Sequence, residues 1–276
     1  MSNIAINRRT AIATGAAFAA ASPALAQSRR RITVATGGTG GVFHPYGVGL
    51  AKIFSEKMAN TQATSQATGG SIDNIKMLHS GEVELGFSTM DSAYDAFQGE
   101  GAYKSDGKQD VRVLASLYDS FFHIVASQAS GIANVAGMKG KRVSVGSAGS
   151  ATESIADRVI EAAGLSPVRD VTRDNLGVAE SAGALKDGKI AAFFWIGGIP
   201  TGAVRDLAAA GQPPIRFVPM TGELAALDRK WPGLYKPFTL AANAYSGQTD
   251  AVAGLGVANV LVVSSKAPAA LVTAML

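Results

Sequence analysis

The sequence has no cysteine among its 276 residues. This absence excludes disulfide scaffolds, thiolate zinc sites, iron–sulfur clusters and cysteine nucleophiles together. Charge is also scarce, since charged residues make up 17% of the chain against a typical value of about 25%, and the formal net charge is only +4. A nucleic-acid-binding domain carries a concentrated basic surface. We therefore expect no nucleic acid as a partner.

Histidine is rare as well. The three histidines, His44, His79 and His123, lie far apart in the sequence, and no H-E-x-x-H motif is present. Two histidines one helical turn apart are what a zinc hydrolase of that type requires. The sequence therefore predicts no metal site.

Glycine, in contrast, is abundant, with 32 residues, but its clusters do not match nucleotide-binding motifs. The cluster at 37–41 lacks the last glycine of G-x-G-x-x-G because residue 43 is Phe, and no Gly-Lys pair follows it. A nucleophile elbow around Ser147 fails because residue 145 is Val. We expect no catalytic residue and no cofactor.

Residues 1–26 have the pattern of an export signal. Arg8 and Arg9 form a positive start, residues 10–21 are uncharged and rich in alanine, and Ala24-Leu-Ala26 is a small-x-small cleavage pattern. The paired arginines are typical of twin-arginine export, and an ordinary secretory signal remains the alternative. We predict cleavage before Gln27 and a periplasmic, non-spanning mature chain whose net charge falls from +4 to +2.

The rest of the chain alternates between strand and helix patterns. Apolar, β-branched runs predict strands, and apolar residues spaced three to four apart predict helices. The expected strands are 31–36, 83–88, 111–117 (extended by 121–126, or followed there by a new strand), 142–145, 190–195, 215–218 and 257–263. The expected helices are 45–58, 71–81, 91–97, 151–163, 179–186 and 222–229, with further helices starting at Pro200 and Pro268. This order predicts an α/β fold with parallel sheets covered on both faces.

Two glycine-rich turns, 37–41 and 146–150, each follow a strand and precede a helix. They suggest two α/β lobes, and ligands of open α/β sheets bind at such strand ends. A helix N-terminus offers unpaired N–H groups to an anion, and hydroxyls such as those of Thr39 and Ser147 add donors. The two turns together would clamp a small acid. The alternative is that the glycines only permit tight turns and that Ser150 only caps its helix.

Five blocks in order carry a family resemblance, namely 36–47 (TGGTGGVFHPYG), 67–74 (ATGGSIDN), 80–87 (SGEVELGF), 145–153 (VGSAGSATE) and 193–202 (FFWIGGIPTG). They resemble the TAXI family, the extracytoplasmic solute-binding proteins of a subclass of TRAP transporters. The resemblance implies a two-lobed, type II-like periplasmic-binding-protein fold with a central ligand cleft and crossing hinge strands. It also implies a small organic acid ligand, such as glutamate or 2-oxoglutarate, and delivery to TRAP-type membrane permease subunits. We expect a monomer.

The motifs place the ligand-binding residues by position. The resemblance assigns Thr39, Gly40, Phe43 and His44 in the first turn, Ser88 and Asp91 after the third strand, Ser147, Gly149 and Ser150 in the second turn, and Trp195 and Gly197 at a strand end. His44 stands where a tyrosine is common. Asp91 would repel an acid unless the ligand carries an amine, and the alternative is that Asp91 only caps a helix. Trp195 has an alternative place in the core.

We expect residues 27–118 and 236–276 to form the first lobe and residues 119–235 to form the second. The family continues beyond the last strand with helices, so the end at Leu276 inside a helix suggests either a C-terminal truncation of the first lobe or a shorter member of the family. Two other functions stay open at this point. One is a secreted serine hydrolase using Ser147 or Ser150, and the other is a ligand-sensing module for a membrane kinase.

Overall fold

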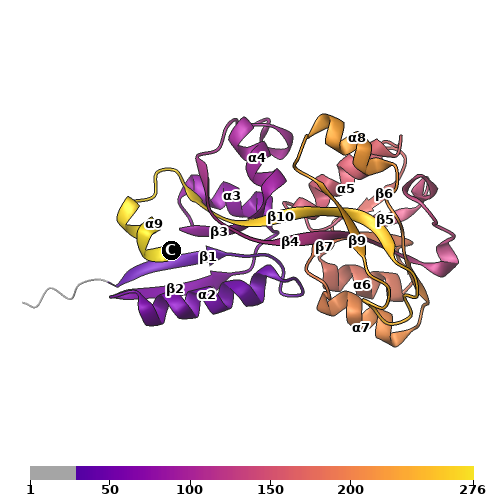
Figure 1. Ribbon diagram of the computed structural model, residues 1–276, viewed down its shortest axis with the longest axis horizontal. Coiled ribbons are helices and arrows are strands. Elements are labelled where there is room, and N and C mark those ends of the chain that lie inside the picture. Colours follow the sequence, from indigo (N-terminus) through magenta and orange to yellow (C-terminus); the bar gives the residue numbers. More distant parts are fainter. Residues whose placement is uncertain (1–28) are drawn as a thin grey trace, which may run out of the picture.

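One mixed sheet runs through both halves of the computed structural model, which describes residues 29–276. Its strand order is β2-β1-β3-β10-β4-β7-β5-β6, with β8 paired to β4 and β9 paired to β10. Helices cover both faces of the sheet at each end (Figure 1). The expected α/β class is therefore confirmed, but the sheet is mixed and not parallel throughout, because the strands β4 (Val111–Ser127) and β10 (Val252–Ser264) run antiparallel to their neighbours. The export signal predicted at 1–26 lies outside the described residues.

The first lobe is built on three parallel strands, β1 (Arg30–Ala35), β2 (Thr61–Gln66) and β3 (Leu85–Thr89). Helix α2 (Phe43–Lys57) covers one face, while α3 (Ser71–Ser80) and α4 (Met90–Gln98) cover the other (Figure 1). Side chains of β1 alternate between the faces, since Val34 packs in the cluster with Phe54 of α2 and Ala35 in the cluster with Ile75 of α3. The C-terminal helix α9 (Ala269–Met275) also packs on the α2 side.

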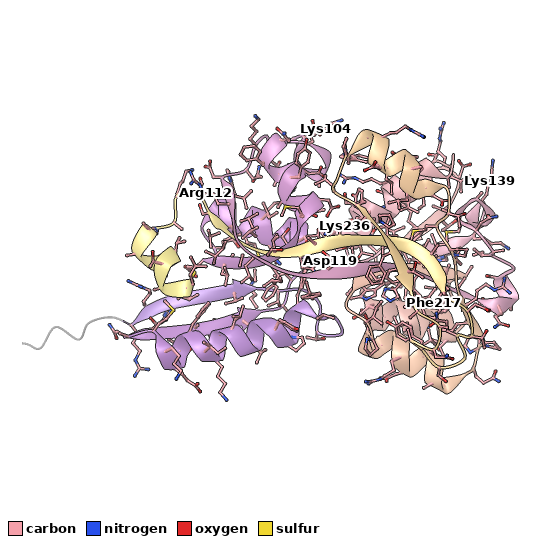
Figure 2. All side chains as sticks on the ribbon, in the orientation of Figure 1. Lys104, Arg112, Asp119, Lys139, Phe217 and Lys236 are labelled. Atoms are coloured by element: carbon pink, nitrogen blue, oxygen red, sulfur yellow. The ribbon has the colours of Figure 1, made fainter. Side chains whose placement is uncertain are left out.

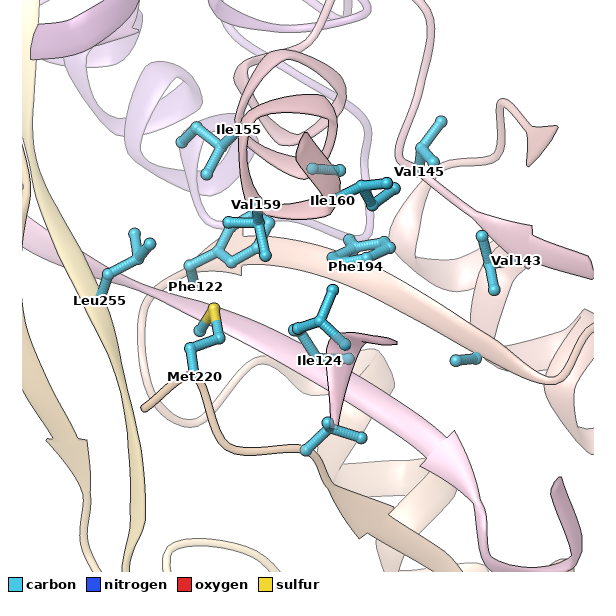
Figure 3. Close-up of a cluster of buried hydrophobic side chains, with 14 of the residues drawn as sticks. Phe122, Ile124, Val143, Val145, Ile155, Val159, Ile160, Phe194, Met220 and Leu255 are labelled. Carbon is cyan, nitrogen blue, oxygen red and sulfur yellow. The ribbon is translucent and has the colours of Figure 1, made fainter. Parts of the chain in front are cut away.

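The second lobe repeats the arrangement with β5 (Arg142–Ser144), β6 (Thr172–Asp174), β7 (Ala192–Gly197) and the short β8 (Ile215–Phe217). Helices α5 (Ala151–Ala162) and α8 (Glu223–Lys230) lie on one face, and α6 (Val178–Lys186) and α7 (Gly202–Ala210) on the other (Figure 1). The core beneath α5 joins Phe122, Phe194, Ile155, Val159 and Met220 (Figure 3). Their burial fixes α5, and with it the turn before it, against the sheet.

Two long antiparallel strands, β4 (Val111–Ser127) and β10 (Val252–Ser264), pass through both lobes. Residues 111–127 thus form one continuous strand, the first of the two alternatives. The pairing is irregular between Ala258 and Val260, where two residues of β4 lie opposite Asn259. Such a β-bulge bends the ladder and redirects a side chain. These are the hinge strands expected of the fold.

Strand β9 (Lys236–Leu240) pairs with the first half of β10, and the ring of Phe238 lies 4.9 Å from that of Phe121. Near the middle of the molecule, Lys236 Nζ lies 3.3 Å from Asp119 Oδ2 (Figure 2). Residues 236–257 therefore pack with the second lobe, and the chain returns to the first lobe within β10. This differs from the expected boundary at 235/236, because the sequence pattern gave no sign of β9.

The sequence pattern also did not predict the edge strands β2 and β6. Both strands are short and mostly polar, so they lack the alternation of apolar residues that predicts a strand. Within residues 29–276, no helix combines the length and apolarity needed to cross a membrane.

Candidate functional site: a cavity between the lobes

A cavity of about 80 Å³ lies between the two lobes. A cavity needs about 10–15 Å³ to hold one water, so this cavity has room for a small solute. Both lobes and both hinge strands contribute to its wall. The lining comprises residues 37–43, Gly69, Gly70, Ser71, Thr89, Tyr118, Ser120, Ser147, Ser150, Ala151, Thr152, residues 177–180, residues 195–197 and Asn259.

Five helices begin at this cavity. Their N-cap residues, which all line it, are Val42 (α2), Gly70 (α3), Thr89 (α4), Ser150 (α5) and Gly177 (α6). The first N–H groups of a helix have no acceptor within the helix, and the aligned peptide dipoles place roughly half a positive charge there. Some of these groups already have partners, since the N–H groups of Ile72 and Asp73 donate to the Gly149 carbonyl and that of Glu153 donates to Ser150 Oγ. The others, together with the helix dipoles, favour a negatively charged group at this wall.

No arginine, lysine or histidine belongs to this lining among the described residues. Among residues 29–276, Glu180 is the one acidic side chain in the wall, and it is an exposed residue in the first turn of α6. What this wall offers to an anion is therefore helix N-termini and not a basic side chain.

Close approach of the lobes depends on Gly149. Its carbonyl accepts hydrogen bonds from the N–H groups of Ile72 and Asp73, each at 3.1 Å, so the second turn is bonded to the start of α3 in the other lobe. A Cβ at residue 149 would lie 1.9 Å from Asp73 Oδ1, and the residue has a φ of 73°. Both the space and the backbone conformation require glycine here.

The first glycine turn has the same role on the other side of the cavity. A Cβ at Gly41 would lie 3.0 Å from the Trp195 ring, and one at Gly40 would lie 3.1 Å from Ala179 Cβ. Trp195 and Ala179 belong to the second lobe. The glycines of both predicted turns thus permit the lobes to meet around the cavity.

The position of Trp195 is fixed by a chain of hydrogen bonds. Its indole N–H donates to Thr201 Oγ1 at 2.9 Å, and the Thr201 hydroxyl donates to the Gly198 carbonyl at 2.7 Å. The Tyr245 hydroxyl accepts from the Thr201 N–H at 2.9 Å and lies 3.1 Å from His123 Nε2. Burial lowers the pKa of His123 to about 3, so this ring is neutral. Trp195 is therefore part of the cavity wall with a buried polar network behind it.

Seven of the eleven predicted site residues lie in the cavity wall, namely Thr39, Gly40, Phe43, Ser147, Ser150, Trp195 and Gly197. The other four do not. His44 follows Phe43 in α2 with a buried Nδ1 that has no partner among residues 29–276, and Gly149 makes the contact between lobes described above. Ser88 is fully buried, and its hydroxyl donates to the Thr89 carbonyl.

Asp91 is also fully buried, away from the cavity wall. The Tyr235 hydroxyl donates to its Oδ2 at 2.9 Å, and Arg158 Nη1 lies 3.5 Å from the same oxygen. The structure therefore gives Asp91 a cationic partner in the other lobe and no place beside a ligand amine.

Several wall residues were not predicted. Gly70 and Ser71 lie in a block that carried the family resemblance but received no role, while Tyr118 and Ser120 lie where β4 crosses between lobes. Asn259 is one asparagine inside an otherwise apolar strand. A polar residue in a buried run is itself a signal, because such a side chain needs hydrogen-bond partners.

The site offers little for catalysis. The Ser150 hydroxyl donates to the Ser147 carbonyl at 2.6 Å and accepts from the Glu153 N–H at 3.1 Å, so it caps α5. Across residues 29–276, no group of three histidine, aspartate or glutamate side chains is arranged to hold a metal ion.

Comparison with known proteins agrees with this fold. Among solved structures, the fold is similar to an ancestral arginine-binding protein bound to arginine (15% identity, 90% of each chain, TM-score 0.52). It is also similar to the substrate-binding protein of an ABC uptake transporter from Streptococcus pneumoniae with bound histidine (14% identity, 90% of this chain and 85% of that chain, TM-score 0.51). The chain thus has the two-lobed periplasmic-binding-protein fold.

A further match is the alkanesulfonate-binding protein SsuA from Xanthomonas axonopodis pv. citri (18% identity, TM-score 0.49), which aligns with 85% of this chain. The chain spans 65% of that protein's length.

The model of the NMT1-like family matches residues 34–276, which include all of the cavity wall. The chain therefore belongs to the NMT1-like family.

Proposed function

We propose that this protein is an extracytoplasmic solute receptor that binds a small organic acid in the cavity between its lobes. It performs no chemical conversion and presents the closed, loaded form to a membrane permease. The observation that carries the proposal is the convergence of five helix N-termini on one cavity whose described wall has no basic side chain.

An anion fits this arrangement for a physical reason. Backbone N–H groups of several helices can hydrogen-bond a carboxylate from different directions, and each helix adds a favourable dipole. Because both lobes supply helices, binding an acid would favour the closed arrangement over an open one. A receptor needs this coupling between binding and closure, so that a permease distinguishes the loaded from the empty form.

The resemblance to the TAXI family supports the finer part of the proposal. Its first block, 36–47, provides the glycine turn and the start of α2 at the cavity, and its later blocks provide the starts of α3 and α5. On this basis the partner is a TRAP-type permease, the protein is a periplasmic monomer, and glutamate and 2-oxoglutarate are the first ligands to test. The proposed ligand-binding residues are the seven predicted ones that line the cavity.

The test begins with protein purified without refolding. Mass spectrometry of the released small molecules is expected to identify an organic acid at one per chain. Titration calorimetry and thermal denaturation with glutamate, 2-oxoglutarate, succinate and lactate should give saturable binding and a melting temperature that rises with ligand concentration. The proposal is overturned if no acid is released and none binds, or if a bound acid is converted to product.

A further inference from the structure

Two polar atoms of wall residues, Asn259 Oδ1 and the Tyr118 hydroxyl oxygen, are buried without a hydrogen-bond partner among residues 29–276. Asn259 on β10 is fully buried and lines the cavity, and its Oδ1 has no partner among residues 29–276. A buried acceptor without a donor is costly. At a ligand cavity, this atom is the acceptor that a bound solute can satisfy.

The orientation of the Asn259 amide is fixed by its nitrogen. Nδ2 donates to the Tyr118 carbonyl at 2.9 Å and to Ser120 Oγ at 2.7 Å. Rotating the amide by half a turn would set Oδ1 against the Tyr118 carbonyl oxygen, which is also an acceptor. Both amide hydrogens are thus used on the β4 side, and Oδ1 is the free group.

The backbone explains why an asparagine lies here. The β-bulge places Leu117 and Tyr118 of β4 opposite the single residue Asn259. The Asn259 side chain supplies a donor to the Tyr118 carbonyl at this interruption of the ladder. This bond holds the amide in one rotamer on the strand that joins the lobes, so its free oxygen has a defined place in the site.

We propose that Asn259 is a specificity-determining residue that accepts a hydrogen bond from a hydroxyl group of the bound solute, and that the preferred solutes are hydroxy acids. This inference rests on the proposed function. The helix N-termini bind the carboxylate of the solute, and Asn259 distinguishes acids by the substituent on C2, the carbon next to that carboxylate. A keto oxygen is an acceptor and would face Oδ1 without a hydrogen between them, and a methylene group would leave Oδ1 unpaired.

An ammonium group is disfavoured for a different reason. A buried cation requires an anionic partner, and a neutral amide oxygen does not provide one. The buried carboxylates of Asp91 and Asp95 are paired with Arg158, and Glu180, the acidic residue in the described wall, is exposed. The site therefore favours a neutral donor over an amino group.

The test compares acids that differ only at C2. One series is glutarate, 2-hydroxyglutarate, 2-oxoglutarate and glutamate, and a shorter series is propionate, lactate, pyruvate and alanine. Calorimetry on the wild-type protein should show the hydroxy acid binding about tenfold or more tightly than the plain and the keto acid of the series that fits. The amino acid should bind more weakly than the hydroxy acid.

Two variants assign this preference to Asn259. Asn259→Leu should reduce the advantage of the hydroxy acid to about twofold or less. Asn259→Asp should weaken binding of every acid but favour the amino acid over the hydroxy acid, since it adds a carboxylate. Asn134→Asp is the matched control, because Asn134 caps a short helix outside the cavity and its side-chain acceptor is kept. Its selectivity should equal that of the wild type.

The outcomes separate the two proposals. Equal wild-type affinities for plain, keto and hydroxy acids would overturn the role of Asn259 while leaving the acid receptor in place. Failure of all eight acids to bind would overturn the proposed function and this inference with it. If a folded Asn259 variant keeps the preference for hydroxy acids, a group other than Asn259 causes that preference, and the role proposed for Asn259 is wrong. Should both variants fail to fold, the wild-type series still decides whether hydroxy acids are preferred.

Discussion

Arg158 on α5 and Asp95 on α4 form an ion pair that joins the two lobes, and 7% and 4% of their side chains are exposed. Arg158 also donates to the Tyr235 hydroxyl at 2.6 Å, and its guanidinium lies 4.1 Å from the centre of the Trp231 ring. Trp231 directly follows α8, and neither Arg158 nor Asp95 lines the cavity. The contact between the lobes therefore buries charged side chains. The guanidinium of Arg158 is the cation, and the carboxylates of Asp95 and Asp91 both lie beside it.

This cluster makes the stability of the protein depend on pH. Burial raises the pKa of Asp95 to about 6, Arg158 opposes the rise, and the neighbouring charge of Asp91 adds to it. Since the folded-state pKa exceeds the ordinary value of 3.8, the stabilisation is complete below about pH 4 and is lost as pH rises through 6. We expect Asp95→Asn to remove this part of the pH dependence.

The measurement is the melting temperature of the wild type and of Asp95→Asn at half-unit steps from pH 3.5 to 7.5. The difference between them should shift in favour of the variant as pH rises from about 4 to 6. Asp206→Asn is the control, because the Asp206 side chain is 72% exposed. Parallel curves for the wild type and Asp95→Asn would show that the Asp95 carboxyl does not titrate in this range.

A substitution at Gly149 should hinder closure. In Gly149→Ala, the new Cβ would clash with the Asp73 carboxylate, and the positive φ disfavours alanine. Gly188→Ala is matched in backbone strain, with a φ of 69°, but its Cβ would meet open space. Affinity for the ligand should fall about tenfold or more in Gly149→Ala and stay near the wild-type value in Gly188→Ala.

Small-angle X-ray scattering with saturating ligand tests whether Gly149 controls closure, because closure reduces the radius of gyration of the protein. The wild type and Gly188→Ala should contract on binding, whereas Gly149→Ala should contract less. Equal contraction and equal affinity in both glycine variants would mean that the contact from Gly149 to Ile72 and Asp73 does not control closure.

The fold and part of the site follow from the sequence because their signals are local. Glycine after a strand and before a helix predicts a turn that a ligand or another lobe can approach, and both such turns lie at the cavity. The partner of Asp91 had no such signal, because Arg158 is 67 positions away and meets it only when two lobes pack. The free oxygen of Asn259 likewise depends on a bulge in the pairing of two distant strands.

Thr201 provides a test of the network behind Trp195. Thr201→Val keeps the shape of the side chain but removes the acceptor of the indole N–H and the donor to the Gly198 carbonyl. We expect urea unfolding to show a loss of about 1–3 kcal/mol, because buried polar groups are left without partners, together with weaker ligand binding. Thr249→Val, at an exposed threonine, should change neither quantity. If Thr201→Val binds the ligand as the wild type does, the hydrogen bond that positions Trp195 is not needed for binding.

Glu180 is the acidic side chain in the described wall of the cavity, and it should oppose binding of an acid. Replacing it by glutamine removes a negative charge at nearly constant shape. Because Glu180 is exposed and its field is screened by salt, we expect Glu180→Gln to bind a dicarboxylate only about two- to fivefold more tightly at low ionic strength, and about equally at 1 M salt. A monocarboxylate should gain less than a dicarboxylate, since repulsion scales with ligand charge.

Calorimetry across a salt series measures both effects, with Glu56→Gln on the exposed side of α2 as the control. Tighter binding of the acid by the wild type than by Glu180→Gln would instead mean that Glu180 accepts a hydrogen bond from the ligand, and would place a donor group of the solute at the start of α6.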